Sequence, residues 1–329
     1  MNLREEFYDD MEMELAEHTY RGYKREIDVF SQWILDKRGK DDLENVSDRD
    51  IKYYLNHLSD EGYATSTIKT RYTAIRKFYS WLEKLHANPS VRFELENKEW
   101  ESPCNFIDIG SLNVFKGNGE SMKEKHAGEN VSLSQEKIEL LIDNVSNPTT
   151  RNELLIALMY ETGMRRHEAR DVRLRDIEIE SGRVKIYDSK TDSTRMGAFD
   201  SRVKSLLRDY IHYGNRDTFK KSSNSDYLFL SRQSEKMNVK QINRTVKKAA
   251  ENAGLQEKVG EDQQGRPRYL ITAHTLRKSF AMSCLENDIS VREIQKALGH
   301  SDIPTTEDYL GLDQRDVTNT LEKFGPKLE

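Results

Sequence analysis

Residues 151–199 read RNELLIALMYETGMRRHEARDVRLRDIEIESGRVKIYDSKTDSTRMGAF, and they decide the fold class of the C-terminal part of this chain. The run of apolar residues from Leu154 to Met159 indicates a buried helix over 151–161. Residues 183–187 alternate between polar and apolar side chains, which predicts a strand. After a turn, residues 196–199 are expected to return as a second strand. A hairpin after a buried helix predicts a mixed, mostly helical domain.

Helical periodicity continues on both sides of this stretch. Towards the C-terminus, a helical pattern starts at Ser132 or Ser134, and further helices are expected at 200–213, 238–253, 275–287, 290–298 and 304–310. Towards the N-terminus, helices are expected at 12–36, 48–60 and 65–86, with Ser47 and Thr65 as N-cap residues of the second and third. The predicted fold class is therefore mainly α, with an N-terminal helical domain and a mostly helical second domain that contains a small β-hairpin sheet.

A change of composition separates the two domains. Residues 90–131 are rich in glycine and polar residues and predict a linker between a domain at 1–89 and a domain at 132–329. Part of this linker has apolar side chains that suit packing, namely Trp100, Phe106, Ile107, Ile109 and Phe115. A chain of 329 residues has room for two domains.

The composition indicates a soluble protein of a reducing compartment. Charged residues make up 33% of the chain and the mean hydropathy is −0.84. The sequence has no apolar run of about 18 residues, so no membrane span is expected, and no signal segment is seen at the N-terminus. Two cysteines, Cys104 and Cys284, fit neither a disulfide scaffold nor a zinc site. We therefore expect a cytoplasmic protein.

The charge is distributed unevenly along the chain. The whole sequence has a formal net charge of −5, but residues 151–278 hold 27 Lys and Arg against 18 Asp and Glu, a net charge of +9. The remaining residues hold 25 basic and 39 acidic side chains, a net charge of −14. Because a local positive field matters more for phosphate binding than the total charge, the sequence remains compatible with a nucleic-acid partner.

Four short motifs follow one another in the positive region and beyond it. They are Thr162-Gly163-Met164-Arg165-Arg166-His167-Glu168, then Lys190 on the predicted hairpin, then His274-Thr275-Leu276-Arg277, and finally Leu298-Gly299-His300 followed by Thr305-Thr306 and Tyr309. In order and spacing these motifs resemble those of the tyrosine recombinase (phage integrase) family. The resemblance covers residues 131–329 by motif, and residues 12–89 more weakly as the family's helical core-binding domain. Arg166-His167 and Lys278 depart from the family's usual pattern.

The resemblance implies that Tyr309 is a nucleophile that attacks a DNA phosphate and forms a 3′-phosphotyrosyl link. Arg165 and Arg277 would neutralise the phosphate. The physical chemistry agrees, because a guanidinium stays charged and its planar fork matches phosphate oxygens. The reaction needs no metal and no cofactor. A packed aromatic on a short helix is the alternative for Tyr309.

The same resemblance implies roles for four further side chains. His274 would accept the tyrosine proton, since imidazole can take up a proton near neutral pH. His300 would hydrogen-bond a phosphate oxygen, with helix capping as its alternative. Lys190 would protonate the leaving 5′ oxygen, although Arg195 lies close by and a hairpin lysine is commonly solvated. Glu168 would be auxiliary and orient Arg165 through a salt bridge; the alternative is a plain surface carboxylate.

Two basic stripes are candidate DNA-binding surfaces. One consists of Lys236, Lys240, Arg244, Lys247 and Lys248, and the other of Lys69, Arg76 and Lys77. Either stripe could instead be a solvated helix face. The implied partner is double-stranded DNA with specific recombination sites, bound by a homo-tetramer that associates with the nucleoid and not with a membrane.

Two other functions are compatible with parts of this pattern. A type IB topoisomerase-like nicking-closing enzyme shares the same chemistry, and a catalytically silent DNA-binding accessory protein would need only the basic stripes. The complete set of motifs argues against the silent protein. The C-terminal residues 313–329 carry Val317, Leu321 and Phe324 at helical spacing. They could dock on a neighbouring protomer or fold back on their own domain.

Overall fold

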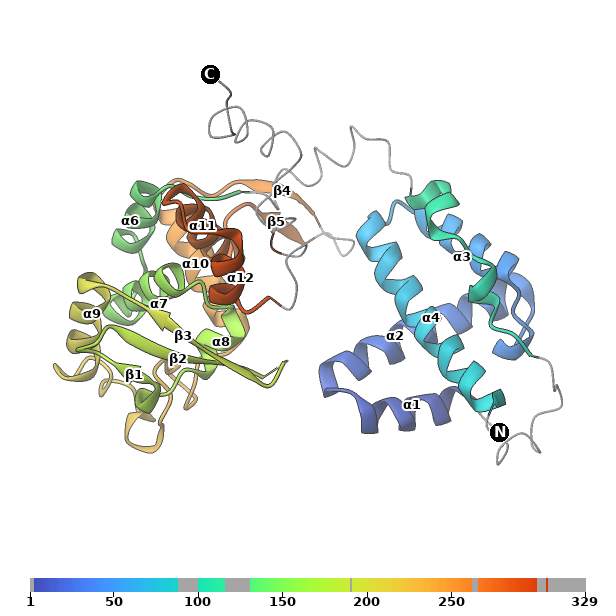
Figure 1. The fold of residues 1–329 in the computed structure, drawn as a ribbon, viewed down its shortest axis with the longest axis horizontal. Coiled ribbons are helices and arrows are strands. Elements are labelled where there is room, and N and C mark those ends of the chain that lie inside the picture. Colours follow the sequence, from blue (N-terminus) through green and yellow to red (C-terminus); the bar gives the residue numbers. More distant parts are fainter. Residues whose placement is uncertain are drawn as a thin grey trace, which may run out of the picture. The chain divides into compact units, whose positions relative to one another are not determined.

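The computed structural model describes residues 3–87, 100–115, 131–189, 191–261, 266–300 and residue 306. The chain forms two compact units, Met1–Lys123 and Glu124–Glu329 (Figure 1). Helices dominate both units, and the described strands form small antiparallel sheets in the second unit. This architecture confirms the predicted fold class. No described helix has the length and the apolar character that crossing a membrane requires.

The N-terminal unit is a helical bundle. Its elements are α1 (Leu3–Glu14), α2 (Glu17–Arg38), the short 3-10 helix η1 (Leu43–Asn45), α3 (Asp48–Asp60) and α4 (Thr65–Ala87). Ser47 caps α3 as expected, because its hydroxyl accepts a hydrogen bond from the backbone N–H of Asp50 at 3.3 Å. The cap expected at Thr65 is wrong, because Thr65 is the first residue of α4 and the backbone N–H of Ile68 donates to the carbonyl oxygen of Ala64 at 3.0 Å. Apolar side chains of all four α-helices meet in one core.

The prediction of one helix over residues 12–36 is wrong at its N-terminal end. The chain breaks at Leu15 and Ala16, and a separate helix, α1, precedes the break. The physical reason is burial: α1 packs on the bundle through Phe7, whose ring centroid lies 5.2 Å from that of Phe78 and 5.4 Å from that of Trp81. A single straight helix could not place this aromatic face against α4.

Part of the expected linker packs on the N-terminal unit. Residues 100–115 contain the 3-10 helices η3 (Pro103–Phe106), η4 (Ile109–Ser111) and η5 (Asn113–Phe115). Cys104 and Ile107 are buried in the core of this unit, and the Trp100 ring stacks on His86 at 4.8 Å between centroids. Phe106 is 59% exposed. The domain boundaries at 89 and 132 stay a prediction.

The C-terminal unit is built around α7 (Thr149–Thr162), whose residues Leu154 to Met159 are all buried. The other helices among the described residues of this unit are α6 (Gln135–Asp143), α8 (Arg166–Asp171), α9 (Ser201–Ile211), α10 (Val239–Asn252), α11 (Ala273–Glu286) and α12 (Val291–Leu298), with the short 3-10 helices η6 (Leu174–Asp176) and η7 (Ser222–Asn224). α6, α9 and α11 pack against α7. The helix expected at 304–310 lies outside the described residues, apart from Thr306.

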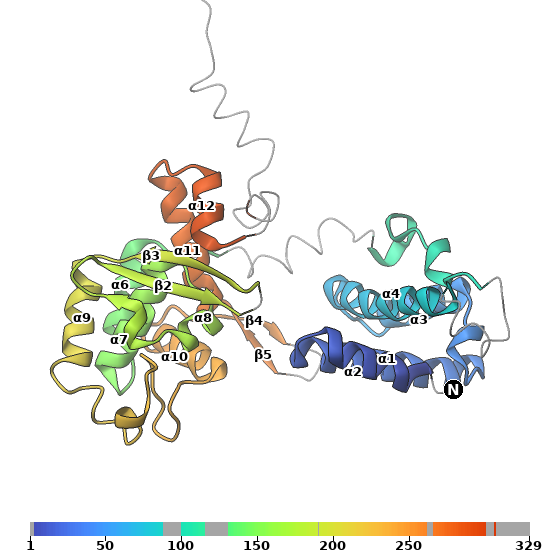
Figure 2. The same ribbon diagram turned by 60° about the horizontal axis from the view of Figure 1, so that its bottom comes forward.

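The predicted hairpin belongs to a three-stranded antiparallel sheet in the order β1 (Ile177–Glu178), β2 (Arg183–Asp188) and β3 (Ser193–Ala198). Val184 and Ile186 on β2 face inwards, towards α7 and α8, and Lys185 and Tyr187 face outwards. α9 lies beside the sheet (Figure 2). A second antiparallel pair, β4 (Lys258–Glu261) and β5 (Pro267–Tyr269), was not expected from the sequence. These strands are too short for side-chain alternation to reveal them.

Candidate active site

The first arginine motif lies at a tight turn between α7 and α8. Gly163 ends α7 with a left-handed backbone (φ 60°), and a Cβ atom at this position would lie 2.4 Å from Cδ1 of Phe280. Only glycine fits both conditions. The turn places Arg165 immediately before α8, where its backbone N–H donates to Oε2 of Glu168 at 2.6 Å.

The carboxylate of Glu168 is fully buried and is shared by arginines from three elements. Nη1 of Arg165 donates to Oε1 at 3.0 Å, and Nη2 of Arg195 on β3 donates to Oε2 at 2.9 Å. Nη1 of Arg277 on α11 lies 3.9 Å from Oε2. A buried carboxylate stays charged only when it is paired in this way. Glu168 therefore gathers positive charge at one place.

A second buried carboxylate, that of Asp188, completes this arrangement. Asp188 ends β2, and its Oδ2 accepts a hydrogen bond from Nη1 of Arg165 at 2.9 Å. The three guanidinium groups of Arg165, Arg195 and Arg277 thus face two carboxylates. The cluster keeps an excess of positive charge, and the Arg165 side chain is 28% exposed. An exposed cation in such a setting suits an anionic ligand.

Arg277 connects the first motif to the third. Its side chain is almost entirely buried; Nη1 donates to the carbonyl oxygen of Gly163 at 2.8 Å, and Nη2 donates to that of Leu298 at 2.7 Å. These carbonyls lie at the C-terminal ends of α7 and α12, where a cation is favoured by the helix dipole. Arg277 thereby holds two helix ends next to each other.

His300 follows the C-terminal end of α12, and His274 lies at the N-terminal end of α11. Gly299 ends α12 with a left-handed backbone (φ 67°), and His300 follows it with its Nδ1 2.9 Å from Oγ1 of the buried Thr306. His274 lies in the first turn of α11. Arg277 donates a hydrogen bond to the carbonyl oxygen of Leu298, two residues before His300. The segment that carries His300 therefore lies next to Arg277 on α11.

The pKa of His274 lies below its ordinary value. Loss of water around the ring is the larger cause, and the positive charges of Arg277, Lys278, Arg165 and Arg166 add to it. The imidazole is therefore neutral at pH 7 and able to accept a proton.

Two members of this cluster were not assigned from the sequence. Arg195 donates through Nε to the carbonyl oxygen of Ala297 at 2.7 Å and through Nη2 to Glu168. The sequence predicts a first strand that ends at residue 187 and a second that begins at residue 196, so neither Asp188 nor Arg195 is placed on a face of the sheet. A strand that starts three residues earlier pairs Arg195 with the inward-facing Ile186. An alternation extended to this register would have predicted that Arg195 faces inwards.

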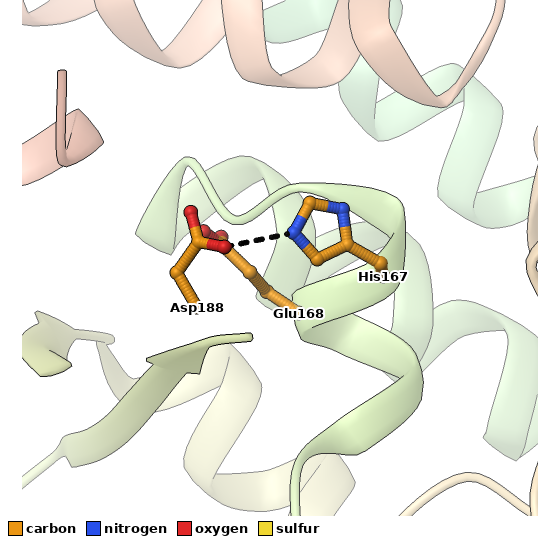
Figure 3. A group of neighbouring side chains, drawn as sticks. All are labelled: His167, Glu168 and Asp188. Atoms are coloured by element: carbon orange, nitrogen blue, oxygen red, sulfur yellow. Dashed lines mark hydrogen bonds and ion pairs between the residues drawn. The ribbon is translucent and has the colours of Figure 1, made fainter. Parts of the chain in front are cut away.

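Three side chains of this cluster also have the atoms of a metal site. Potential ligand atoms of His167, Glu168 and Asp188 all lie within 4.8 Å of one another (Figure 3). Nε2 of His167 lies 3.3 Å from Oδ1 of Asp188. However, both carboxylates already bind the guanidinium of Arg165. This group therefore suits the orientation of an arginine better than the binding of a metal ion.

The basic stripe of the C-terminal unit lies on and before α10. Lys240, Arg244 and Lys248 are exposed on one face of the helix, and Lys248 pairs with Glu251 at 3.1 Å. Nζ of Lys247 lies 4.6 Å from the centroid of the Tyr269 ring. Lys236 precedes the helix and pairs with Asp171 at 3.1 Å. Arg244 and Lys240 are thus the members least engaged with protein groups.

The second stripe lies on α4, in the N-terminal unit. Lys69 and Arg76 are exposed, and Nζ of Lys77 lies 3.7 Å from a carboxylate oxygen of Glu14. Lys190 and Tyr309 lie outside the described residues. Of the catalytic set, the structure therefore gathers Arg165, Glu168, His274, Arg277 and His300.

Comparisons with known proteins agree with this geometry. The phage integrase family matches residues 132–315, and the N-terminal SAM-like domain of phage integrases matches residues 5–85. Tyrosine recombinase XerD of Oceanobacillus iheyensis is 26% identical over an alignment of 330 positions that covers 98% of this chain and 98% of XerD. Tyrosine recombinase XerC of Natranaerobius thermophilus is 24% identical over an alignment of 324 positions that covers 96% of this chain and 95% of XerC.

Solved structures share the fold. The site-specific recombinase XerH bound to palindromic difH substrate has a TM-score of 0.67 at 20% identity, covering 93% of this chain and 80% of XerH. The Tn1549 transposon integrase in complex with a circular intermediate DNA has a TM-score of 0.70 at 16% identity, covering 98% and 100%. These matches confirm the resemblance found in the four motifs. The chain therefore belongs to the phage integrase family, the family of the tyrosine recombinases.

Proposed function

We propose that this protein is a site-specific recombinase that cleaves and rejoins double-stranded DNA through a 3′-phosphotyrosyl link to Tyr309. The observation that carries the proposal is the cluster around Glu168. Arginines from three separate elements meet at one buried carboxylate, and two histidine segments adjoin them. Such a cluster provides fixed positive charge where a phosphate gains negative charge in the transition state.

The reaction begins with the tyrosine proton. A free tyrosine with a pKa of about 10 is ionised in roughly one molecule in a thousand at pH 7, which corresponds to about 4 kcal/mol. His274 takes the proton of the Tyr309 hydroxyl, because its lowered pKa keeps the imidazole neutral. The phenolic oxygen attacks the scissile phosphorus, and the bond between phosphorus and the 5′ oxygen breaks.

The remaining side chains of the set act on the phosphate and the leaving group. Arg165 and Arg277 neutralise the phosphate oxygens, and His300 hydrogen-bonds one of them. Lys190 gives its proton to the departing 5′ oxygen, which leaves as a hydroxyl. Attack of a 5′ hydroxyl on the phosphotyrosyl link reverses every step and rejoins the strand. The phosphodiester bond energy is kept in the link, so no nucleotide cofactor takes part.

The partner in this proposal is duplex DNA that carries specific recombination sites. The exposed cations of α10 and of α4 provide backbone contacts in the two units. The solved neighbours support this assignment by analogy, since XerH is bound to its difH substrate and a lambda integrase dimer to a COC′ core site. The proposed place of action is the cytoplasm, on nucleoid DNA.

We further propose that four copies act together on two DNA sites. The C-terminal unit has a cavity of about 670 Å³ between α6, α7 and α11, lined in part by Ile138, Ile142 and Phe280. The apolar residues Val317, Leu321 and Phe324 give the C-terminal segment a chemistry that suits this cavity on a neighbouring protomer. The double change Leu321→Asp with Phe324→Asp should reduce the mass of the DNA-bound assembly. If the mass of the DNA-bound tetramer stayed unchanged, the C-terminal segment would not dock in this cavity.

A nicked suicide substrate tests the central proposal. The intact protein should form a covalent adduct with the nicked strand, and Tyr309→Phe should bind the same DNA without forming it. An adduct that persists in Tyr309→Phe would remove the nucleophile assignment. Absence of any adduct with the intact protein would favour the accessory-protein alternative. Recombination between two sites, compared with relaxation of a single-site plasmid, separates the recombinase from a topoisomerase-like enzyme.

A further inference from the structure

A small basic cavity lies on the outer side of the three-stranded sheet, on the strand face opposite Asp188. Its volume is about 350 Å³. Residues from the α8–η6 segment, from β2 and β3, and from the loop at Tyr227 line it, and Arg173, Arg175 and Lys185 are its cations. We call this cavity the sheet notch.

Positive charge in the sheet notch exceeds negative charge. Its two carboxylates are already engaged: Asp171 pairs with Arg170 and with Lys236, and Asp176 accepts a hydrogen bond from the backbone N–H of Arg173 at 3.0 Å. Arg175 and Lys185 are exposed, and neither makes an ion pair or a side-chain hydrogen bond with the part of the chain that the structure describes. Two cations aimed at one concave surface without a protein partner suit an anionic ligand.

The sheet notch is continuous with the basic stripe of α10. Lys236, the first member of that stripe, lies with its Nζ 4.6 Å from the centroid of the Tyr227 ring and 3.1 Å from Asp171. Both Tyr227 and Asp171 line the notch, and Arg173 packs on the same tyrosine ring at 5.3 Å. The basic surface therefore runs from α10 across Tyr227 to β2.

We infer that the sheet notch binds phosphates of the DNA backbone at a distance from the scissile phosphate. The inference rests on the proposed function. Lys185 precedes Asp188 by three residues on β2, which is about 10 Å along a strand, and Asp188 holds Arg165. The notch therefore lies close to the Arg165 site along β2 but on the other face of the strand, so it is placed for a phosphate other than the one that Arg165 binds.

The double variant Arg175→Gln with Lys185→Gln tests this site. If each cation meets one phosphate, the slope of log affinity against log salt should become shallower by about 1 to 2, and affinity at 0.1 M salt should fall by at least about tenfold. The matched control is Arg202→Gln with Arg208→Gln on α9, which removes the same charge from side chains already paired with Asp143 and Glu180. Equal slopes for the notch variant and the control would overturn the inference.

A scan with single methylphosphonates identifies the phosphate. In duplexes that carry one neutral linkage each, one or two positions should weaken binding by the intact protein and have little further effect on the notch variant. If every position weakens both proteins by the same factor, the notch holds no phosphate, and an acidic protein partner becomes the better occupant. Adduct formation by the intact protein on a nicked substrate is measured in parallel, because its loss would count against the proposed function and not against the notch alone.

Discussion

Arg195 donates a hydrogen bond to the buried carboxylate of Glu168 at 2.9 Å, although 27 residues separate them in the chain. The same guanidinium donates through Nε to the carbonyl oxygen of Ala297, three residues before His300. One side chain thus ties the hairpin strand β3 both to the first arginine motif and to the end of α12. Arg195 is a positioning residue in this arrangement, since it acts through the groups that it holds.

Replacement of Arg195 by lysine should slow DNA cleavage without weakening DNA binding. An ammonium keeps the charge but lacks the planar fork that bonds to two acceptors at once. A shift of about 1 Å in a catalytic group can cost roughly a hundredfold in rate, so we expect a loss of about 10- to 100-fold in the single-turnover rate. Arg202→Lys on the exposed face of α9 is the control. A wild-type rate in Arg195→Lys would show that the connection is dispensable.

Glu168→Gln should destabilise the C-terminal unit. The change keeps the shape of the side chain but leaves the buried guanidinium of Arg277 and the partly buried guanidinium of Arg195 without their shared negative charge. Removal of one partner of a buried ion pair costs about 3–5 kcal/mol. Amide hydrogen exchange in α7 and α11, measured by mass spectrometry, should become faster. The control Glu180→Gln removes an exposed carboxylate, and similar exchange in the two variants would contradict the structural role of Glu168.

The sequence predicts the parts of this protein in which one local pattern determines the structure. Leu154 to Met159 are apolar and form the buried turn of α7, and the alternation at 183–187 marks β2. Motif spacing also indicated the family, which the comparisons confirm. Each of these features depends on residues close together in the chain.

Other features depend on contacts between distant segments, and the local sequence does not contain them. The role of Arg195 requires α12 to approach β3, and α1 exists as a separate helix because Phe7 meets Trp81. The strands β4 and β5 are too short for periodicity to reveal. The sheet notch combines residues from three separate segments. These relations appear only after the helices have packed.

Asp50→Asn should destabilise the N-terminal unit at neutral pH. Burial acts to raise the pKa of Asp50, but hydrogen bonds from Lys40, Ser47 and Arg38 outweigh it and lower the pKa below its usual value. Arg38 and Lys40 each contact the carboxylate at 2.6 Å. Hydrogen bonds to a charged group are worth about 1.5–3 kcal/mol, so we expect a loss of about that size in unfolding free energy.

The pH dependence and the fluorescence of this unit make the Asp50 measurement specific. A lowered pKa in the folded state means that the stabilisation is present above the unfolded pKa of about 3.9 and is lost as the pH falls through the folded value. The difference between Asp50→Asn and the intact protein should therefore shrink below about pH 4. All three tryptophans, Trp33, Trp81 and Trp100, belong to this unit, so their fluorescence reports its unfolding. Asp48→Asn, at a more exposed carboxylate, is the control.

Chelation of divalent metals should leave the rate of DNA cleavage unchanged. The carboxylates of Glu168 and Asp188, which could bind a metal ion with His167, already accept hydrogen bonds from Arg165. In the proposed chemistry the guanidinium groups, and not a metal ion, neutralise the charge of the phosphate. The measurement is the single-turnover rate after dialysis against EDTA, with and without added Mg²⁺ or Zn²⁺. Cleavage that returns only with added metal would contradict the proposed chemistry.

Lys278→Met should move the acid limb of the cleavage rate to higher pH. Loss of water around the ring and then the charges of Arg277 and Lys278 hold the pKa of His274 below its ordinary value. The neutral imidazole accepts the tyrosine proton, so the rate is constant above this pKa and falls as the pH drops through it. Without the Lys278 charge the pKa rises, and the loss of rate begins at a higher pH. Lys137→Met on α6 should leave the profile unchanged. A variant that lowers the plateau rate and leaves the limb in place would show that Lys278 acts only in packing and would contradict its electrostatic effect on His274.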